Sequence, residues 1–214
     1  MSDKRAYLVL GPESSGTRLM TRLLIAAGCE GTDEHVQPWD SQTPTAPLIV
    51  WRRSLPHGGQ WPDVQRLVAR LQEADYAVTA LVMSRDWHPM ALSQIDNGHV
   101  ADMAQAISHI QRAYGLIFPA LAALRIPFEL INLEGLIARP QQAVAELVTR
   151  LGLAQPAAVE VYDANAKHYG GLEAIQGDVE TVKATIRERY GFEAPDAYCR
   201  DLVSFVEALS VARV

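Results

Sequence analysis

The sequence predicts an α/β protein with a mainly parallel central sheet between two layers of helices, a three-layer α/β/α architecture. Four short apolar runs, each typical of a buried strand, alternate with stretches in which apolar residues recur at helical spacing. Parallel strands need right-handed crossovers, so the connecting helices cover both faces of the sheet. The 214 residues suit a single domain spanning 1–214, since no linker or internal repeat divides them.

The elements follow in order from the N-terminus. The run AYLVL at 6–10 is the first strand, and the stretch at 17–27 that follows its glycine-rich turn has helical spacing. Residues 29–46 are polar, contain two prolines and are predicted to form a long loop. The other predicted strands are 47–51, 76–83 and 127–132, and the other predicted helices are 62–73, 89–95, 101–124, 141–151, 179–190 and 197–211.

Composition excludes several classes of function. Nineteen Lys and Arg against twenty-five Asp and Glu give a net charge of −6, which argues against a general nucleic-acid or membrane-surface binder. No apolar run approaches the roughly 20 residues of a membrane span, and the first residues lack a signal-peptide pattern, so a cytoplasmic protein is expected. Cys29 and Cys199 have no metal-ligand spacing and are expected to be buried, reduced thiols.

The first motif is the run GPESSGTR at 11–18, between the first strand and the first helix. In that context the backbone N–H groups of the turn converge on one point, and the helix dipole favours an anion there. Gly11 and Gly16 allow backbone conformations that a side chain would hinder, and Ser15 and Thr17 add hydroxyl donors. The run therefore predicts a phosphate-binding loop, against the alternative of a plain glycine-containing turn.

This loop lacks the lysine of nucleoside-triphosphatases. In those proteins the loop ends Gly-Lys-Ser/Thr, with the lysine on the phosphates and the hydroxyl on Mg²⁺. Here Thr17 and Arg18 follow Gly16, and no second acidic motif at a strand end suits Mg²⁺. The sequence implies no metal.

The second motif closes the third predicted strand. Arg85 ends that strand, and Ser93 comes eight residues later on the following helix. The planar guanidinium of arginine suits a phosphate, and a hydroxyl from the next helix can join it. This spacing alone is also compatible with a surface arginine and an ordinary helix serine.

A third segment completes a resemblance. FELINLEGLIARP at 128–140 is a strand, an acidic turn and a proline-started helix, and it leads to Leu-Gly-Leu at 151–153. The three segments, in this order and strand context, resemble sulfotransferases over about residues 6–153, with a looser match at 163–171. Glu134 in this segment is expected to be a helix or turn residue.

The resemblance implies a P-loop-like sulfotransferase fold and a donor co-substrate, 3′-phosphoadenosine-5′-phosphosulfate. It implies that Arg85 and Ser93 hold the 3′-phosphate, and that the late basic loop with Lys167 and Gly170 closes over the nucleotide. The implied nucleotide-binding residues are Gly11, Ser14, Ser15, Gly16, Thr17, Arg18, Arg85, Ser93, Lys167 and Gly170.

The chain departs from the family at one position. Many sulfotransferases carry a basic residue where this chain has Ser14, and that residue stabilises the bridging oxygen as the sulfuryl group leaves. Arg18 instead follows the threonine, which resembles the Gly-Thr-Arg of glycan sulfotransferases. Arg18, Arg52 or Lys167 could supply the charge, or the protein could bind the nucleotide poorly and have another function.

Two residues are candidates for the base that takes the acceptor proton. Glu34 lies in the loop after the first helix, about where glycan sulfotransferases place a catalytic glutamate. His57 follows Leu-Pro after the second strand, whereas the histidine-using branch of the family has its base where this chain has Ser54. A solvated loop carboxylate and a turn histidine are the alternatives. Arg52 and Arg53 alternate, so at most one of them faces the cleft.

The sequence thus predicts an enzyme that moves a sulfuryl group to a hydroxyl or amine acceptor, whose identity stays open between a glycan and a small molecule. A P-loop kinase or NTPase is one alternative, which would want a loop lysine and a metal-binding carboxylate. A non-catalytic nucleotide-binding protein of the same fold is the other, and Ser14 in place of a basic residue favours it.

Overall fold

The computed structural model describes residues 4–157, 160–169, 178–190, 196, 199, 200 and 203. The chain divides into two compact units, Met1–Val161 and Tyr162–Val214, and each is described by itself. The single domain over 1–214 stays a prediction.

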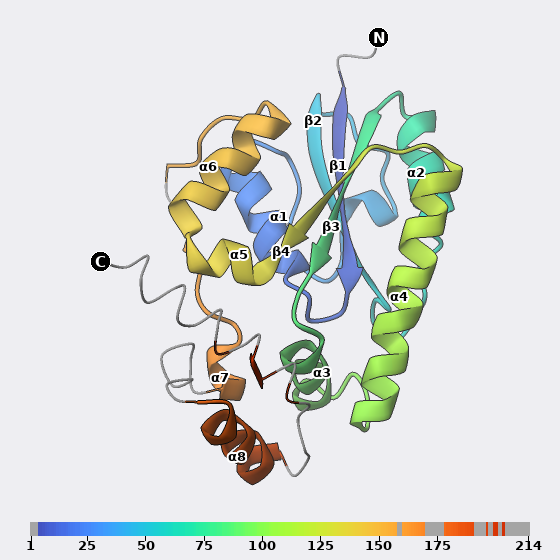
Figure 1. Cartoon of the computed structure of the whole chain (residues 1–214). Helices are drawn as coiled ribbons and strands as arrows, with labels where there is room; N and C mark the ends of the chain where they lie inside the picture. The colour runs from blue at the N-terminus through green and yellow to red at the C-terminus, as the bar shows by residue number, and fades with distance from the viewer. Residues whose placement is uncertain are drawn as a thin grey trace. The chain divides into compact units, whose positions relative to one another are not determined.

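The first unit is built on one sheet of four parallel strands (Figure 1). The strands are β1 (Arg5–Pro12), β2 (Leu48–Leu55), β3 (Ala77–Ser84) and β4 (Phe128–Asn132), in the order β2-β1-β3-β4. All three pairings are parallel, which places the carboxyl ends of the strands at one edge. The predicted α/β class is confirmed, and the sheet is parallel throughout.

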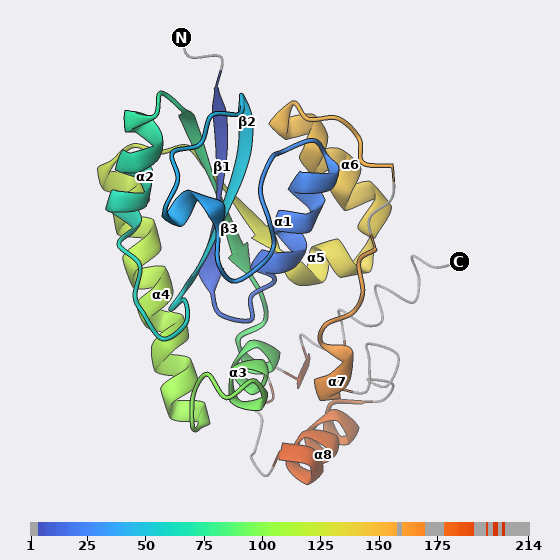
Figure 2. The same cartoon turned by 180° about the vertical axis from the view of Figure 1, so that it is seen from behind.

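Helices cover both faces of this sheet, as Figures 1 and 2 show from opposite sides. One face packs on α1 (Thr17–Ala26), α5 (Leu133–Ala138) and α6 (Pro140–Leu151), and its apolar side chains form one buried cluster. The other face packs on α2 (Val64–Glu73) and α4 (Met103–Ala123) around a second cluster. The result is the three-layer arrangement that alternating strands and helices predict.

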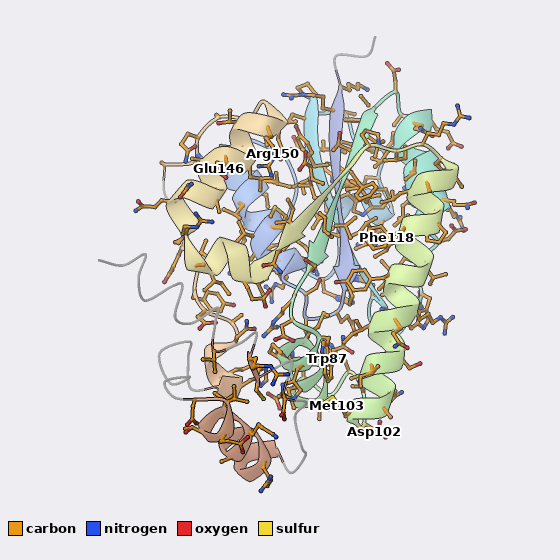
Figure 3. All side chains as sticks on the ribbon, viewed as in Figure 1. Trp87, Asp102, Met103, Phe118, Glu146 and Arg150 are labelled. Carbon is orange, nitrogen blue, oxygen red and sulfur yellow. The ribbon has the colours of Figure 1, made fainter. Side chains whose placement is uncertain are left out.

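Short polar residues fix where several helices begin. The carboxylate of Asp63 accepts hydrogen bonds from two backbone N–H groups at the start of α2. Asp102, labelled in Figure 3, accepts one from the backbone N–H of Gln105 in the first turn of α4. Asp86 accepts from the backbone N–H of His88, so α3 (Trp87–Asp96) begins two residues before the predicted start at 89. Gly152 ends α6 in the left-handed conformation.

Three local predictions need correction. β2 runs to Leu55 rather than to 51. The prediction stopped early because Arg52, Arg53 and Ser54 are polar, although all three are buried. A short helix, α5, lies where the sequence indicated only an acidic turn, and Glu134 lies in its first turn. The predicted long loop contains a 3₁₀ turn, η1 (Pro38–Asp40).

The second unit contains α7 (Ala166–Tyr169) and α8 (Val179–Tyr190) among its described residues. α8 confirms the predicted helix at 179–190, and α7 lies where a loop was expected. Most of the predicted helix at 197–211 is outside the described residues. Cys29 and Cys199 are both buried and unbridged. Among the described helices, none combines the length and apolarity that crossing a membrane requires.

Candidate functional site

The turn between β1 and α1 has the backbone of an anion-binding loop. Ser14 and Gly16 both have positive φ, 67° and 97°, and the backbone N–H of Ser15 donates to the carbonyl oxygen of Pro12 at 3.2 Å. Gly16 immediately precedes α1, and no side chain caps that helix start. The free N–H groups of the first turn are thus left to a ligand or to solvent.

Close packing explains both loop glycines. A Cβ on Gly11 would lie 2.5 Å from Ser15 Oγ, and one on Gly16 would lie 3.1 Å from a methyl group of Leu133. Ser15 is fully buried, and its hydroxyl has no hydrogen-bond partner within the described part of the chain. Thr17, also buried, begins α1. The loop therefore holds a buried hydroxyl beside the strand end.

Arg85 joins the second motif to the loop. Its Nη1 donates to the backbone oxygen of Ser14 at 2.7 Å and to Ser93 Oγ at 3.2 Å. Arg85 and Ser93 are buried, with 7% and 3% of their surface exposed. The two residues, eight positions apart in sequence, thus lie together against the loop between β1 and α1.

A second set of contacts, which the sequence did not reveal, holds the same loop at Glu13. Gln94 Nε2 donates to the Glu13 carbonyl oxygen at 2.9 Å, and His99 Nδ1 lies 3.2 Å from Glu13 Oε2. Burial raises the pKa of Glu13, opposed by His99 and by a hydrogen bond from the backbone of Gly58. A pairing between residues of two separate loops leaves no local pattern in the sequence.

The two consecutive arginines of β2 lie on opposite faces of the sheet. Arg52 is on the face of α1, where its Nη2 donates to the backbone oxygen of Glu34 at 2.8 Å. Within the described residues its Nε is buried without a partner. Burial, and then the charge of Arg18, lower the pKa of Arg52. Arg53 is on the face of α2 and pairs with Asp40.

Arg18 is held at the surface. Its Nη2 lies 3.3 Å from a carboxylate oxygen of Asp33, and 57% of its side chain is exposed. Arg22 contacts the same oxygen at 2.7 Å. Burial alone would raise the pKa of Asp33, but the hydrogen bonds and charges of Arg22 and Arg18 lower it below its usual value.

The two candidate bases have different surroundings. Glu34 is exposed, and its backbone oxygen accepts from Gln37 Nε2 as well as from Arg52. His57 is partly buried, with Nδ1 3.1 Å from Ser54 Oγ and Nε2 2.9 Å from the backbone oxygen of His35. Burial lowers the pKa of His57 to about 4, so this ring is neutral at neutral pH.

The predicted late loop, at 163–171, belongs to the second unit and is described only in part. Lys167 lies in α7 of the second unit, and Gly170 lies outside the described residues. Their place in a nucleotide site stays a prediction. Among the described residues, no three His, Cys, Asp or Glu side chains are grouped to hold a metal ion.

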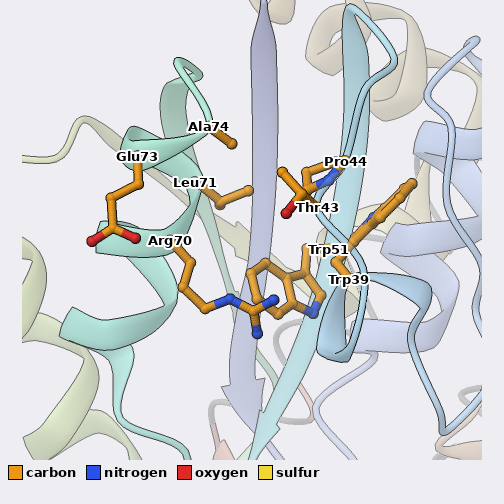
Figure 4. A pocket seen from close by; sticks show the side chains of 8 residues that line it. All are labelled: Trp39, Thr43, Pro44, Trp51, Arg70, Leu71, Glu73 and Ala74. Carbon is orange, nitrogen blue, oxygen red and sulfur yellow. The ribbon is translucent and has the colours of Figure 1, made fainter.

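A small cavity lies apart from the loop, on the α2 side of β2 (Figure 4). Trp39 and Trp51 form part of its wall, and Arg70 lies over the Trp51 ring at 5.3 Å. Arg70 also donates to the backbone oxygen of Asp40 at 3.2 Å. These contacts tie α2 to η1 and brace the strand that carries Arg52.

In comparisons with known proteins, neither a protein-family model nor a curated protein matches this chain. The chemistry of the site therefore rests on its own geometry. A loop of backbone N–H groups, a buried hydroxyl and the guanidinium groups of Arg52 and Arg85 form an environment suited to an anion.

Proposed function

We propose that this chain is a sulfotransferase that moves a sulfuryl group from 3′-phosphoadenosine-5′-phosphosulfate to a hydroxyl or amine acceptor. The observation that carries the proposal is the contact of Arg85 with both the Ser14 carbonyl and Ser93 Oγ. That contact joins an arginine–serine pair to a phosphate loop, and a donor nucleotide with phosphates at both its 5′ and 3′ positions needs two such anion sites side by side.

In this proposal the loop amides and α1 hold the 5′-phosphosulfate, whereas Arg85 and Ser93 hold the 3′-phosphate. The amides are fixed donors at a helix start, and a guanidinium can bind two phosphate oxygens at once. The P-loop-like sulfotransferase fold belongs to the same proposal.

Charge on the leaving phosphate needs a cation, since Ser14 stands where a basic residue is expected. Arg52 fits that role well: it is 6% exposed, faces α1, and keeps an N–H that no described residue accepts. A cation shielded from water stabilises developing charge more strongly than an exposed one. Arg18, bound to Asp33 at the surface, would contribute to the approach of the nucleotide.

Calorimetric titration tests the donor site. Adenosine 3′,5′-bisphosphate should bind at least tenfold more tightly than adenosine 5′-monophosphate, as expected for a charge-assisted contact of ~1.5–3 kcal/mol. Arg85→Ala should abolish that preference. Arg150→Ala is the matched control, since Arg150 is half-exposed on α6 and pairs with Glu129 instead. Equal affinities in the wild-type protein would contradict the proposal.

The same titration separates the alternatives. A P-loop kinase or NTPase should bind ATP with Mg²⁺ more tightly than the bisphosphate, and its turnover should collapse with EDTA. A sulfotransferase should keep its turnover under chelation, because N–H and guanidinium donors stabilise the leaving phosphate. Tight bisphosphate binding without any transfer would identify a non-catalytic nucleotide-binding protein.

A further inference from the structure

Ser54, His57 and the backbone of His35 form a chain of hydrogen bonds at the end of β2. Ser54 Oγ lies 3.1 Å from His57 Nδ1, and His57 Nε2 lies 2.9 Å from the His35 carbonyl oxygen. A carbonyl oxygen only accepts, so Nε2 must carry the proton of the neutral ring. Nδ1 therefore holds the lone pair, and the Ser54 hydroxyl donates to it.

The surroundings of His57 hold the ring in this orientation. The backbone N–H of His57 donates to the Gln60 carbonyl oxygen at 2.7 Å, and Gln60 returns a hydrogen bond at 3.2 Å. The ring also stacks on His35, with centroids 4.2 Å apart and planes 7° from parallel. A side chain held by its backbone, a ring stack and two hydrogen bonds is preorganised for one task.

The chain of hydrogen bonds ends beside the phosphate loop. Ser54 pairs with Gly11 in the parallel register of β1 and β2. Because side chains alternate along a strand, Ser54 shares the α1 face with Arg52, two residues before it. Ser54 is only 5% exposed, so bulk water does not compete for its hydrogen bond.

We propose that Ser54 and His57 form a proton relay that takes the proton of the acceptor. The inference rests on the proposed function. As the acceptor oxygen forms its bond to sulfur, its proton passes to Ser54 Oγ, and the Ser54 proton passes to His57 Nδ1. The bond between sulfur and the bridging oxygen breaks, and its electron pair stays on the leaving phosphate. His57 becomes a cation whose Nε2–H remains bound to the His35 carbonyl.

The relay distinguishes between the two candidate bases, Glu34 and His57, which the sequence alone left open. Glu34 is exposed, and the hydrogen bonds described for it involve its backbone and not its carboxylate. The lone pair of His57 instead faces a hydroxyl on the same face as Arg52. His57 acts through Ser54, which explains how a histidine three residues past that strand position can take up the proton.

The test uses the full chain and three variants: Ser54→Ala, His57→Asn and the double variant. The introduced asparagine would still offer an oxygen to Ser54 but cannot take up a proton near neutral pH. Titration with adenosine 3′,5′-bisphosphate first establishes that each protein folds and fills its donor site. The rate is the release of 3′,5′-bisphosphate from 3′-phosphoadenosine-5′-phosphosulfate, with water or simple alcohols as acceptors.

Each single variant should lower that rate by about 10²-fold, as expected for loss of a positioned proton acceptor. The double variant should be no slower than either single one, because both remove the same relay. The rate in mixtures of light and heavy water should curve for the wild-type protein, since two protons move together, and be linear for Ser54→Ala. Ser41→Ala, at the exposed end of η1, is the serine control.

Full rates in either single variant, or additive losses in the double variant, would overturn the relay. A wild-type protein that binds the bisphosphate but releases none from the donor would contradict the proposed transferase function, not the relay alone. Nitrogen-15 spectra of the His57 ring give an independent readout: a neutral ring with its proton on Nδ1 contradicts the assignment. If the bisphosphate itself does not bind, it is the proposed function that fails.

Discussion

Arg52 and Arg53 are neighbours in sequence, are equally buried and have opposite surroundings. Arg53 donates to the Arg52 carbonyl at 2.8 Å, pairs with Asp40 and lies 5.5 Å from the Trp51 ring. The side chain of Arg52, on the other face, has one described hydrogen bond, to the backbone oxygen of Glu34, and an unpartnered Nε. The strand pleat thus separates an arginine that pairs with Asp40 from one that keeps an unpartnered N–H among the described residues.

The largest effect is expected from Arg52→Ala. If Arg52 stabilises the leaving phosphate, the rate of bisphosphate release should fall by about 10²–10³-fold, the range typical of a lost charge-stabilising donor. Arg52→Lys should recover part of that loss, because it keeps the charge without the planar geometry. An unchanged rate in Arg52→Ala would remove the distinction between the two arginines.

Arg53→Ala should affect stability rather than turnover. The substitution leaves the carboxylate of Asp40 without its ion-pair partner and opens a space beside Trp51, so the free energy of unfolding should fall by about 2 kcal/mol. Urea unfolding measures this, and bisphosphate affinity should stay the same. Arg53→Met, which keeps an apolar stem over Trp51, should recover part of the stability. A slower rate with full stability would contradict the comparison.

A smaller effect concerns pH. Burial, and to a lesser degree the charges of Arg53 and Arg52 and the neighbouring His35, lower the pKa of His57 to about 4, against 6.5 in an unfolded chain. Between pH 4 and pH 6.5 the unfolded state binds more protons than the folded state does. The contribution of the neutral His57 ring to the free energy of unfolding is therefore complete above about pH 6.5 and is lost as the pH falls toward 4. After allowance for solvent screening, it amounts to about 1 kcal/mol.

The measurement is urea unfolding of the wild-type protein and of His57→Asn at pH 7.5 and at pH 4.5. The variant lacks the titrating ring, so its stability should fall less between the two conditions. Equal losses in both proteins would mean that His57 has an ordinary pKa. The carboxylates titrate alike in both proteins, so their effect cancels when the stability loss of the variant is subtracted from that of the wild-type protein.

Much of the fold was predictable because its signals are local. The apolar runs before Gly11 and Arg85 are strands, and the glycine-rich loop lies at a helix start. A shared site for Arg85 and the loop was expected from the resemblance, and the parallel strands bring the two together at one edge of the sheet. The end of β2 was missed because Ser54 and the two arginines are polar yet buried, which apolar periodicity does not reveal.

Contacts between separate loops were not predictable. Glu13 and His99 are far apart in sequence. Ser54 and His57 are close in sequence, but their side chains meet only because the turn after β2 folds His57 back toward the strand. α5 was missed because six residues are too few for a helical period to emerge. The sequence indicated that at most one of Arg52 and Arg53 faces the cleft. Which of the two it is depends on how the strand packs against α1 and α2.

The hydrogen bonds that Arg85 and Gln94 make to the carbonyl groups of Ser14 and Glu13 have a consequence for how a ligand would arrive. Both side chains belong to the region after β3, and they hold the loop through contacts within the protein itself. The entropy of ordering the loop is therefore lost when the chain folds, and an incoming anion has little of it left to lose. An anion should accordingly bind to a preformed site, and no slow ordering of the loop should follow the first contact.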